Sequence, residues 1–272
     1  MKKLCVVLIM GVLILSLTAC ATKIENPVIR LSTTTSVNDS GLMAYLQPIF
    51  EKDTGYTLEI TSAGTGAAIE KGRTGDADVL LVHAKASEEE FINEGFGELR
   101  VPFMYNYFVI VGPEGDPAGV KGSATAAEAF KKIADAGATF VSRGDDSGTH
   151  KAELKIWKAL ELDPTGQPWY VSVGDSMGKT LTVGNEMQGY VFTDKATYLA
   201  HENTLSLLLE ETEDMKNTYA MIAITPQRFA DTNFAGAQAF IEWMTSEKAA
   251  DLIAKFGLEQ YGEQLFFILA TQ

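Results

Sequence analysis

The chain has 272 residues, of which 46% are hydrophobic and 21% are charged, the balance of an ordinary globular protein. Its formal net charge of -14 repels nucleic acid and anionic membrane surfaces, so polyanion binding is excluded as the default function and no nucleic-acid partner is expected. A chain of this length is expected to form two lobes, since single hydrophobic cores stop growing at about this size.

The amino terminus has the pattern of an export signal. Two lysines precede a mostly apolar run, Leu4 to Leu17, that is too short to cross a bilayer and ends in small residues. The adjoining Leu17-Thr18-Ala19-Cys20 resembles the lipobox of bacterial lipoproteins, in which cleavage before the cysteine frees it for lipid attachment. We therefore predict a signal peptide over residues 1–19 and a lipid on Cys20, with a short buried helix as the alternative.

These assignments leave the mature protein without a free thiol. Cys5 lies inside the predicted signal peptide and Cys20 carries lipid, so neither a disulfide nor a thiolate metal site is expected. Residues 20–26 then hold the lipid anchor and a short polar tether. The predicted product is an exported acidic protein, held by its lipid at the outer face of the cytoplasmic membrane of a bacterium.

Strands and helices alternate along the rest of the chain. The first unit is a strand at 28–31, a hydroxyl-rich turn at 32–36 and a helix between Gly41 and Gly55, where apolar residues recur at helical spacing. The next elements in order are a strand at 58–60, a helix at 67–72, a strand at 79–82 and a helix beginning near residue 88. This alternation predicts a mainly parallel sheet with helices on both faces.

A long apolar strand at 103–111 precedes a second such series, and the crossing between the two lobes is placed there. A strand at 190–193 is expected to return the chain to the first lobe. The predicted fold class is α/β with two lobes, residues 27–107 plus 195–272 and residues 108–194, connected by hinge strands. The other expected elements are helices at 125–136, 149–160, 234–244 and 247–256 and strands at 139–141 and 219–224.

Three strand-to-helix junctions share small and hydroxyl residues: 33–36, 62–66 and 143–149. The first N–H groups of a helix lack intrahelical partners and lie at the positive end of its dipole, and such ends bind oxyanions. Because the ligand crevice of an open α/β sheet lies beyond the carboxyl ends of its strands, we expect these junctions to share one site. Taken singly, each is more typical of an ordinary helix cap or turn than of a ligand site.

Arg143 adds a full positive charge to the third junction. A guanidinium at the end of the strand 139–142 is suited to holding two oxygens of an anion. The alternative is an ion pair with Asp145 or Asp146, and the two interpretations are compatible if the acids orient the arginine.

Two other chemistries are disfavoured by spacing. Residues 174–180 look like a nucleotide-binding P-loop, but three residues separate the glycines where that motif has four, so a helix starting near Ser176 is preferred. Ser147 and His150 are close in sequence, yet Gly-x-Ser-x-Gly is absent and no acid is implicated in orienting the histidine. A serine hydrolase is therefore only a remote alternative, and no catalytic residue is assigned.

No cofactor or metal cation is expected. His83, His150 and His201 are scattered, without metal-ligand spacing, and His83 after a buried strand is typical of a hydrogen-bonded polar residue in a core. The acidic run 210–214 lacks the pattern of a calcium loop and is interpreted as a solvated face. Trp157 is expected to serve packing.

A set of motifs, in this order and over nearly the whole mature chain, resembles the tungstate-binding lipoproteins of bacterial ABC importers (TupA type). The hydroxyl segments taken separately are also similar to those of phosphate and molybdate receptors. The motifs are the lipobox, Ser32-Thr-Thr-Thr-Ser36, Ser62-Ala-Gly-Thr-Gly66, Gly75-Asp-Ala-Asp-Val-Leu-Leu-Val-His83, Tyr105-Asn-Tyr-Phe-Val-Ile-Val-Gly-Pro113, Ser142-Arg-Gly-Asp-Asp-Ser-Gly-Thr-His150 and Thr193-Asp-Lys-Ala-Thr-Tyr-Leu199.

This resemblance implies a type II periplasmic-binding-protein fold that closes on tungstate, or on the related molybdate, and delivers the anion to an ABC permease and ATPase complex, as a monomer and without enzymatic activity. One departure from the family is Lys179, within Ser176-Met-Gly-Lys-Thr-Leu181, which either adds charge near the cleft or points to solvent. The ligand-binding residues carried over from the family are Thr34, Thr35, Ser36, Thr65, Gly66, Arg143, Ser147, Gly148 and Thr149.

Protonation separates the candidate ligands. Tungstate and molybdate are fully deprotonated dianions at neutral pH and accept hydrogen bonds only, whereas hydrogen phosphate keeps a proton and needs an acceptor. A carboxylate of Asp145, Asp146 or Asp175 pointing into the cleft would therefore favour phosphate. Three classes of protein stay open: an oxyanion receptor for tungstate, molybdate or phosphate, a surface hydrolase, and an adhesive or structural surface protein.

Overall fold

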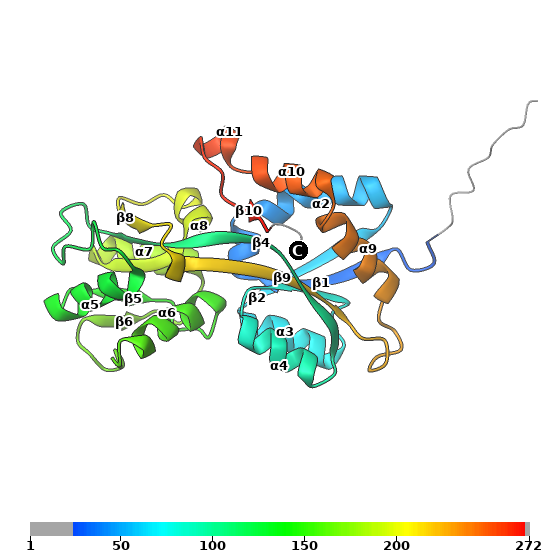
Figure 1. Cartoon of the computed structure of the whole chain (residues 1–272), viewed down its shortest axis with the longest axis horizontal. Coiled ribbons are helices and arrows are strands. Elements are labelled where there is room, and N and C mark those ends of the chain that lie inside the picture. Colours follow the sequence, from blue (N-terminus) through cyan, green and yellow to red (C-terminus); the bar gives the residue numbers. More distant parts are fainter. Residues whose placement is uncertain (1–23, 270–272) are drawn as a thin grey trace, which may run out of the picture.

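The computed structural model describes residues 24–269, so the predicted signal peptide and Cys20 lie outside the described residues. Two lobes lie side by side and are connected by two long strands, β4 (Gly97–Gly112) and β9 (Lys216–Ile224), as Figure 1 shows. Each lobe has a sheet with an apolar cluster on either face. The predicted two-lobed α/β fold is confirmed.

The first lobe has the strand order β2-β1-β3-β9-β4, with β10 pairing to β4. Strand β1 is parallel to both β2 and β3, and β9 is antiparallel to β3. One apolar cluster lies under α1, α2, α9 and α10, and the other under α3 and α4. The elements of this lobe are β1 (Val28–Thr34), α1 (Thr35–Asp39), α2 (Leu42–Thr54), β2 (Thr57–Ala63), α3 (Thr65–Thr74), β3 (Val79–Val82), α4 (Lys85–Asn93), α9 (Phe234–Met244), α10 (Glu247–Lys255), α11 (Leu258–Tyr261) and β10 (Phe267–Ile268).

The second lobe continues the sheet through β7, β5 and β6, while β8 pairs with the other edge of β4. Strand β5 is parallel to β6 and β7. Helices α5 and α6 pack on one face and α7 and α8 on the other. The elements are α5 (Ala126–Ala136), β5 (Phe140–Ser142), α6 (Gly148–Ala159), β6 (Tyr170–Ser172), α7 (Met177–Met187), β7 (Tyr190–Asp194), α8 (Lys195–Ala200), β8 (Ser206–Glu210) and a 3-10 turn (Glu213–Met215).

Strand pairing shows where the chain crosses between lobes. Strand β4 pairs with β9 up to Tyr107 and with β7 from Phe108, so the first crossing lies inside this single long strand. The return differs from the prediction: residues 190–193 belong to β7 in the second lobe, and β9 carries the chain back. Because β8 pairs with β4 at 109–112, residues 206–210 also lie in the second lobe, beyond the boundary predicted at 194/195.

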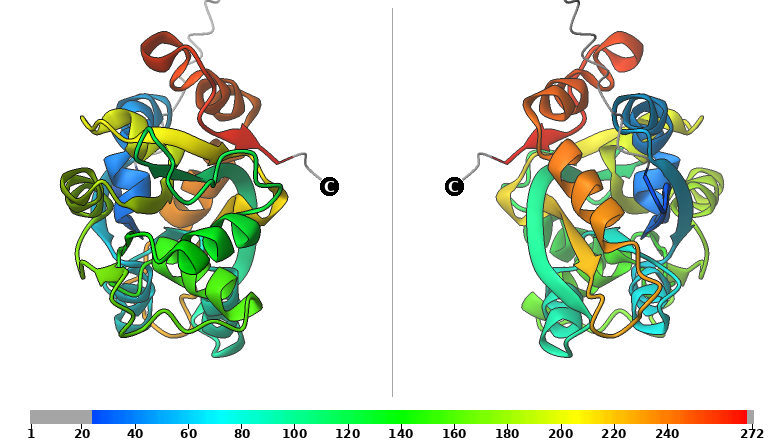
Figure 2. Two further views of the ribbon diagram at one scale, coloured as in Figure 1. Left: turned by 90° about the vertical axis from the view of Figure 1, so that its left-hand side faces the viewer. Right: turned by 90° about the vertical axis from the view of Figure 1, so that its right-hand side faces the viewer.

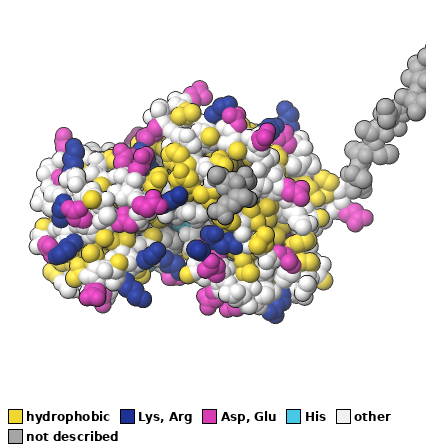
Figure 3. Space-filling view, in the orientation of Figure 1, with side chains coloured by type: hydrophobic (Ala, Val, Ile, Leu, Met, Phe, Trp, Pro, Cys, Tyr) yellow, Lys and Arg dark blue, Asp and Glu magenta, His cyan; other side chains and the backbone are white. Residues whose placement is uncertain are grey.

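Charged side chains of both signs lie on the surface, among hydrophobic ones. Figure 2 shows helices flanking the sheets in both end views, and Figure 3 shows acidic and basic side chains interspersed over the face drawn. The acidic run 210–214 is mostly exposed, as predicted for a solvated face. Within residues 24–269, no helix has the length and apolar character needed to span a membrane.

Candidate functional site

The three hydroxyl-rich segments meet where the two lobes face each other. Arg143, which follows β5 in the second lobe, donates from Nη2 to Oγ1 of Thr35 in the first lobe at 3.1 Å. Asp146 Oδ2 lies so close to Gly66 that a Cβ atom at this glycine would be 3.0 Å from it. The sequence placed these segments at strand ends, and the structure brings them together between the lobes. The region formed by residues 33–36, 62–66 and 143–149 is called the seam below.

The first segment begins inside a strand. Pairing with β2 carries β1 through Thr34, and pairing with β3 through Thr33, beyond the predicted end at residue 31, and α1 follows directly. Thr34 and Ser36 are buried, and their hydroxyl oxygens lie 3.2 Å apart. Thr35 is half-buried and is the residue that meets Arg143.

The second segment leaves the start of α3 free of side-chain caps. The helix begins at Thr65, two residues before the predicted start, and its N-cap is Gly64, which has no side chain with which to bond the first N–H groups. Thr65 is fully buried and its Oγ1 has no hydrogen-bond partner. The first turn of this helix therefore presents amide and hydroxyl donors at the positive end of a dipole.

The third segment starts α6 with a capped turn. Ser147 is the N-cap, and its Oγ accepts from the backbone N–H of His150 at 3.1 Å, which leaves its own O–H as a donor. Thr149 is buried and its Oγ1 has no partner. Gly148 is required by close packing, because a Cβ there would lie 2.8 Å from both ring nitrogens of His83 in the other lobe.

Arg143 forms the ion pair with Asp145, and its role in holding an anion stays a prediction. The side chain is 3% exposed, and Nη2 donates to Asp145 Oδ2 at 2.6 Å as well as to Thr35, while Nε is buried without a partner. The carboxylate of Asp145 thus orients the guanidinium without using all of its donors.

Unpartnered donors concentrate at the seam. Among the described residues, five buried side-chain N or O atoms lack a hydrogen-bond partner, and four belong to residues of the seam or of the strands that cross it. Because leaving a buried donor unpaired costs about 1–3 kcal/mol, such a concentration is typical of a site built for a polar ligand. The four atoms are Thr65 Oγ1, Asn106 Nδ2, Arg143 Nε and Thr149 Oγ1.

The nearby carboxylates are already occupied. Asp145 accepts from Arg143 with Oδ2 and from the N–H of Ser147 with Oδ1 at 3.1 Å. Asp146 pairs with Lys151 at 2.6 Å, and the exposed Asp175 accepts from the N–H of Ser176. Asp145 and Asp146 are thus each paired with a cation, and the unpartnered side-chain atoms at the seam belong to donor groups.

A comparison with known proteins places the chain. A family model described as "PBP superfamily domain" matches residues 21–248. The chain belongs to this PBP superfamily. It is 44% identical over 269 residues to the tungstate-binding protein TupA of Peptoclostridium acidaminophilum, and the match covers 93% of each chain. The resemblance found in the motifs is thus confirmed.

Two solved structures of this PBP family agree. The tungstate ABC transporter structure from Geobacter sulfurreducens has 41% identity, a TM-score of 0.78, and coverage of 84% of this chain and 98% of that one. The tungstate-binding protein TupA from Desulfovibrio alaskensis G20 has 42% identity, a TM-score of 0.78, and coverage of 90% and 100%. These relatives are named as transport and binding proteins.

The seam also contains a network of buried, hydrogen-bonded polar side chains that the sequence did not predict. His83 Nδ1 donates to Asn217 Oδ1 at 2.8 Å, and Nε2 lies 3.2 Å from Ser36 Oγ. Burial lowers the pKa of His83 to about 4, so the ring is neutral at pH 7. The prediction that His83 is a hydrogen-bonded core residue is confirmed, but its position between the lobes was not foreseen.

Another buried acid supports the second lobe from behind. Glu153 on α6 accepts from Ser142 Oγ at 2.6 Å, from Tyr170 O–H at 2.6 Å and from Trp157 Nε1 at 3.1 Å. Burial raises the pKa of Glu153 to about 7. Since Ser142 directly precedes Arg143, this cluster fixes the strand end from which the guanidinium projects. Trp157 lies in the core of this lobe, as predicted.

The geometry of the remaining candidates does not support other chemistries. His150 accepts from the N–H of Asp146 with Nδ1, and its side chain makes no hydrogen bond to Ser147, so the paired nucleophile and base of a hydrolase are not assembled. Within the described range 24–269, no group of three or more His, Cys, Asp or Glu residues could hold a metal ion. Lys179 is exposed.

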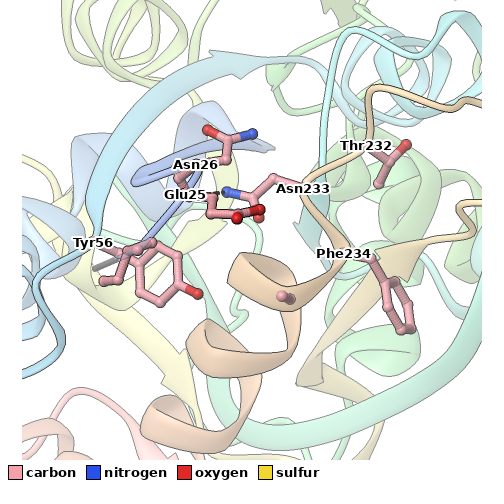
Figure 4. Close-up of a pocket in the computed structure, with 8 residues that line it drawn as sticks. Glu25, Asn26, Tyr56, Thr232, Asn233 and Phe234 are labelled. Atoms are coloured by element: carbon pink, nitrogen blue, oxygen red, sulfur yellow. Dashed lines mark hydrogen bonds between the residues drawn. The ribbon is translucent and has the colours of Figure 1, made fainter. Parts of the chain in front are cut away.

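A pocket of about 490 Å³ lies elsewhere, beside the start of α9. Figure 4 shows the hydrogen bond from Asn233 to the backbone of Asn26, which holds the segment that leads into β1. The ring of Phe234 points away from Asn233 and Asn26. The carboxylate of Glu25 at this pocket disfavours an anion. Its lining residues are Ile24, Glu25, Asn26, Tyr56, Thr232, Asn233, Phe234 and Ala235, none of which is a predicted site residue.

Proposed function

We propose that this protein is the extracytoplasmic solute-binding protein of an ABC importer and that it binds tungstate, and by the same chemistry molybdate, between its lobes. The observation that carries the proposal is the accumulation of unpartnered donors at a seam where Asp145 and Asp146 are each paired with a cation. The names of the relatives, tungstate-binding proteins at 37–44% identity, support the same ligand.

The donor set accounts for discrimination between oxyanions. A fully deprotonated dianion needs hydrogen bonds on every oxygen, and the hydroxyls of Thr65 and Thr149, the guanidinium of Arg143 and the starts of α3 and α6 supply donors of that kind. Hydrogen phosphate would bring an O–H group into a seam where Asp145 has both oxygens in use. That mismatch disfavours phosphate.

Contacts between lobes support binding by closure. The Arg143–Thr35 hydrogen bond and the packing of Gly148 against His83 join the two lobes across the seam. A hinge motion about β4 and β9 would open this seam to admit the ligand, and closure would bury the ligand among the donors. We propose a monomeric, non-catalytic receptor that presents the closed form to a permease and ATPase complex.

The proposal includes export and lipid anchoring at Cys20, which rest on the sequence alone. A Cys20→Ala variant expressed in the native host should lose incorporation of labelled palmitate and be released from the membrane. Palmitate incorporation that persists in this variant would contradict the anchor.

Isothermal titration calorimetry of the soluble domain with tungstate, molybdate, sulfate and phosphate tests the ligand assignment. We expect tungstate and molybdate to bind far more tightly than phosphate near pH 7.5, and to raise the melting temperature by linkage. A protein that binds phosphate as tightly as tungstate would refute the donor-only site. A protein that responds to none of the four anions would refute the receptor function.

A further inference from the structure

A buried amide on the hinge has a donor group with no partner. Asn106 lies on β4 directly opposite Asn217 on β9, on the two strands that connect the lobes. The residue is 1% exposed, and its Nδ2 makes no hydrogen bond of acceptable geometry, although its amide lies beside the Tyr219 hydroxyl. A neutral donor in this state has lost its hydrogen bonds to water and gained none in return, so a partner is expected in the working state of the protein.

The neighbouring asparagine fixes the orientation of this amide. Asn217 Nδ2 donates to Asn106 Oδ1 and to the hydroxyl oxygen of Tyr219, each at 2.9 Å, and Asn217 Oδ1 accepts from His83 at 2.8 Å. Both ends of the Asn217 amide are therefore in use. Asn106 turns its oxygen toward Asn217, which leaves its Nδ2 as the free end.

The same network leads to the candidate donors of both lobes. His83 Nε2 lies 3.2 Å from Ser36 Oγ in the first lobe, and its ring packs against Gly148 at the start of α6 in the second. One chain of hydrogen bonds thus connects the side chain of Asn106 to Ser36 at the seam. The free Nδ2 belongs to the same set of buried, unpartnered donors as those of Thr65, Arg143 and Thr149.

We propose that Asn106 is an oxyanion-binding residue placed in the hinge, and that its Nδ2 donates to an oxygen of the ligand when the lobes close. The proposal rests on the function proposed above and adds a third origin for the donors, besides the two lobes. It also makes Asn106 a specificity-determining residue, because the free end of the amide can donate to a fully deprotonated oxyanion but cannot accept from the O–H of hydrogen phosphate.

The substitution Asn106→Asp tests this role with little change of shape. Aspartate keeps an oxygen that accepts from Asn217 and replaces only the free donor with an acceptor. We expect the affinity for tungstate to fall about 10- to 100-fold at pH 8 and the affinity for hydrogen phosphate to fall less. The preference of the protein for tungstate over phosphate should therefore become smaller. Between pH 8 and pH 6, the variant should regain tungstate affinity relative to the wild type, because a protonated carboxyl donates again.

Two further variants complete the experiment. Asn106→Ala removes the donor without adding charge and should weaken tungstate binding about tenfold. Asn38→Asp, at an exposed position on α1, adds the same charge near the seam and should leave the selectivity unchanged. Melting temperatures of the ligand-free proteins show whether each variant folds.

The outcomes are distinct. If the wild type binds tungstate and both Asn106 variants bind it within about twofold of wild type, the assignment of Asn106 is wrong and the proposed function stands. A loss of affinity that is equal for tungstate and phosphate and independent of pH would assign Asn106 a structural role only, and would also overturn the inference. A wild type that binds none of the oxyanions overturns both proposals.

Discussion

Replacing the buried threonines of the seam with valine should strengthen the fold and weaken the site. Thr65 and Thr149 each bury a hydroxyl that bonds to no protein group. Valine has nearly the same shape, so Thr65→Val and Thr149→Val remove that hydroxyl without opening a cavity. Because the unpaired group costs about 1–3 kcal/mol in the ligand-free protein, each variant should gain that much stability.

The gain and the loss are both measurable. For a chain of this size, each kcal/mol shifts the melting temperature by about 2–4 °C, so the ligand-free variants should melt a few degrees above wild type. Each variant loses one hydrogen bond to a charged ligand, worth about 1.5–3 kcal/mol, so the tungstate Kd should rise about 10- to 150-fold. The temperature shift that saturating tungstate produces should shrink correspondingly.

Thr232→Val is the matched control. Its hydroxyl is also buried and unpartnered, but it lies beside the pocket near α9 and not at the seam. This variant should gain stability with tungstate affinity unchanged. Differential scanning calorimetry measures the melting temperatures of the three variants, and isothermal titration calorimetry measures their tungstate affinities. Seam variants that melt below wild type, or that bind tungstate as well as wild type does, would refute the assignment of these hydroxyls as ligand donors.

Three other predictions follow from the seam. Arg143→Ala should weaken tungstate binding by about 2–5 kcal/mol by calorimetry, since it removes the buried cation that joins the lobes; unchanged affinity would exclude Arg143 from the site. Gly148→Ala should hold the lobes apart, because its Cβ would lie 2.8 Å from the His83 ring nitrogens; solution X-ray scattering should show no tungstate-induced compaction, and normal compaction would contradict this contact. The unfolding free energy of the wild type should rise between about pH 4 and pH 6.5, because in this window the unfolded chain binds a proton at His83 that the folded protein does not bind. In urea titrations, the His83→Gln variant should lose up to about 3 kcal/mol of this rise. A pH profile that is the same in the variant and the wild type would contradict the buried neutral ring.

The sequence by itself determined the local features of this protein. Alternating strands and helices gave the α/β class, because apolar periodicity is a local signal. Hydroxyl and small residues at three strand ends marked the donor segments, because helix starts and turns depend on neighbouring residues. The motif order was sufficient to assign the PBP family, and with it the two-lobed fold.

The sequence also predicted that the three segments share one site, and the tertiary structure decided which residues touch across the seam and what each donor bonds to. Arg143 and Thr35 are 108 residues apart in the chain, and Asn106 and Asn217 are 111 apart. A sequence shows that Asn106 interrupts an apolar strand, but whether its amide is satisfied depends on partners from β9. Likewise, the pairing of β8 with β4 moved the lobe boundary, because a strand's place in a sheet is set by its distant neighbours. Hydrogen-bond satisfaction is a property of the folded chain, and it is the property on which the proposed oxyanion site rests.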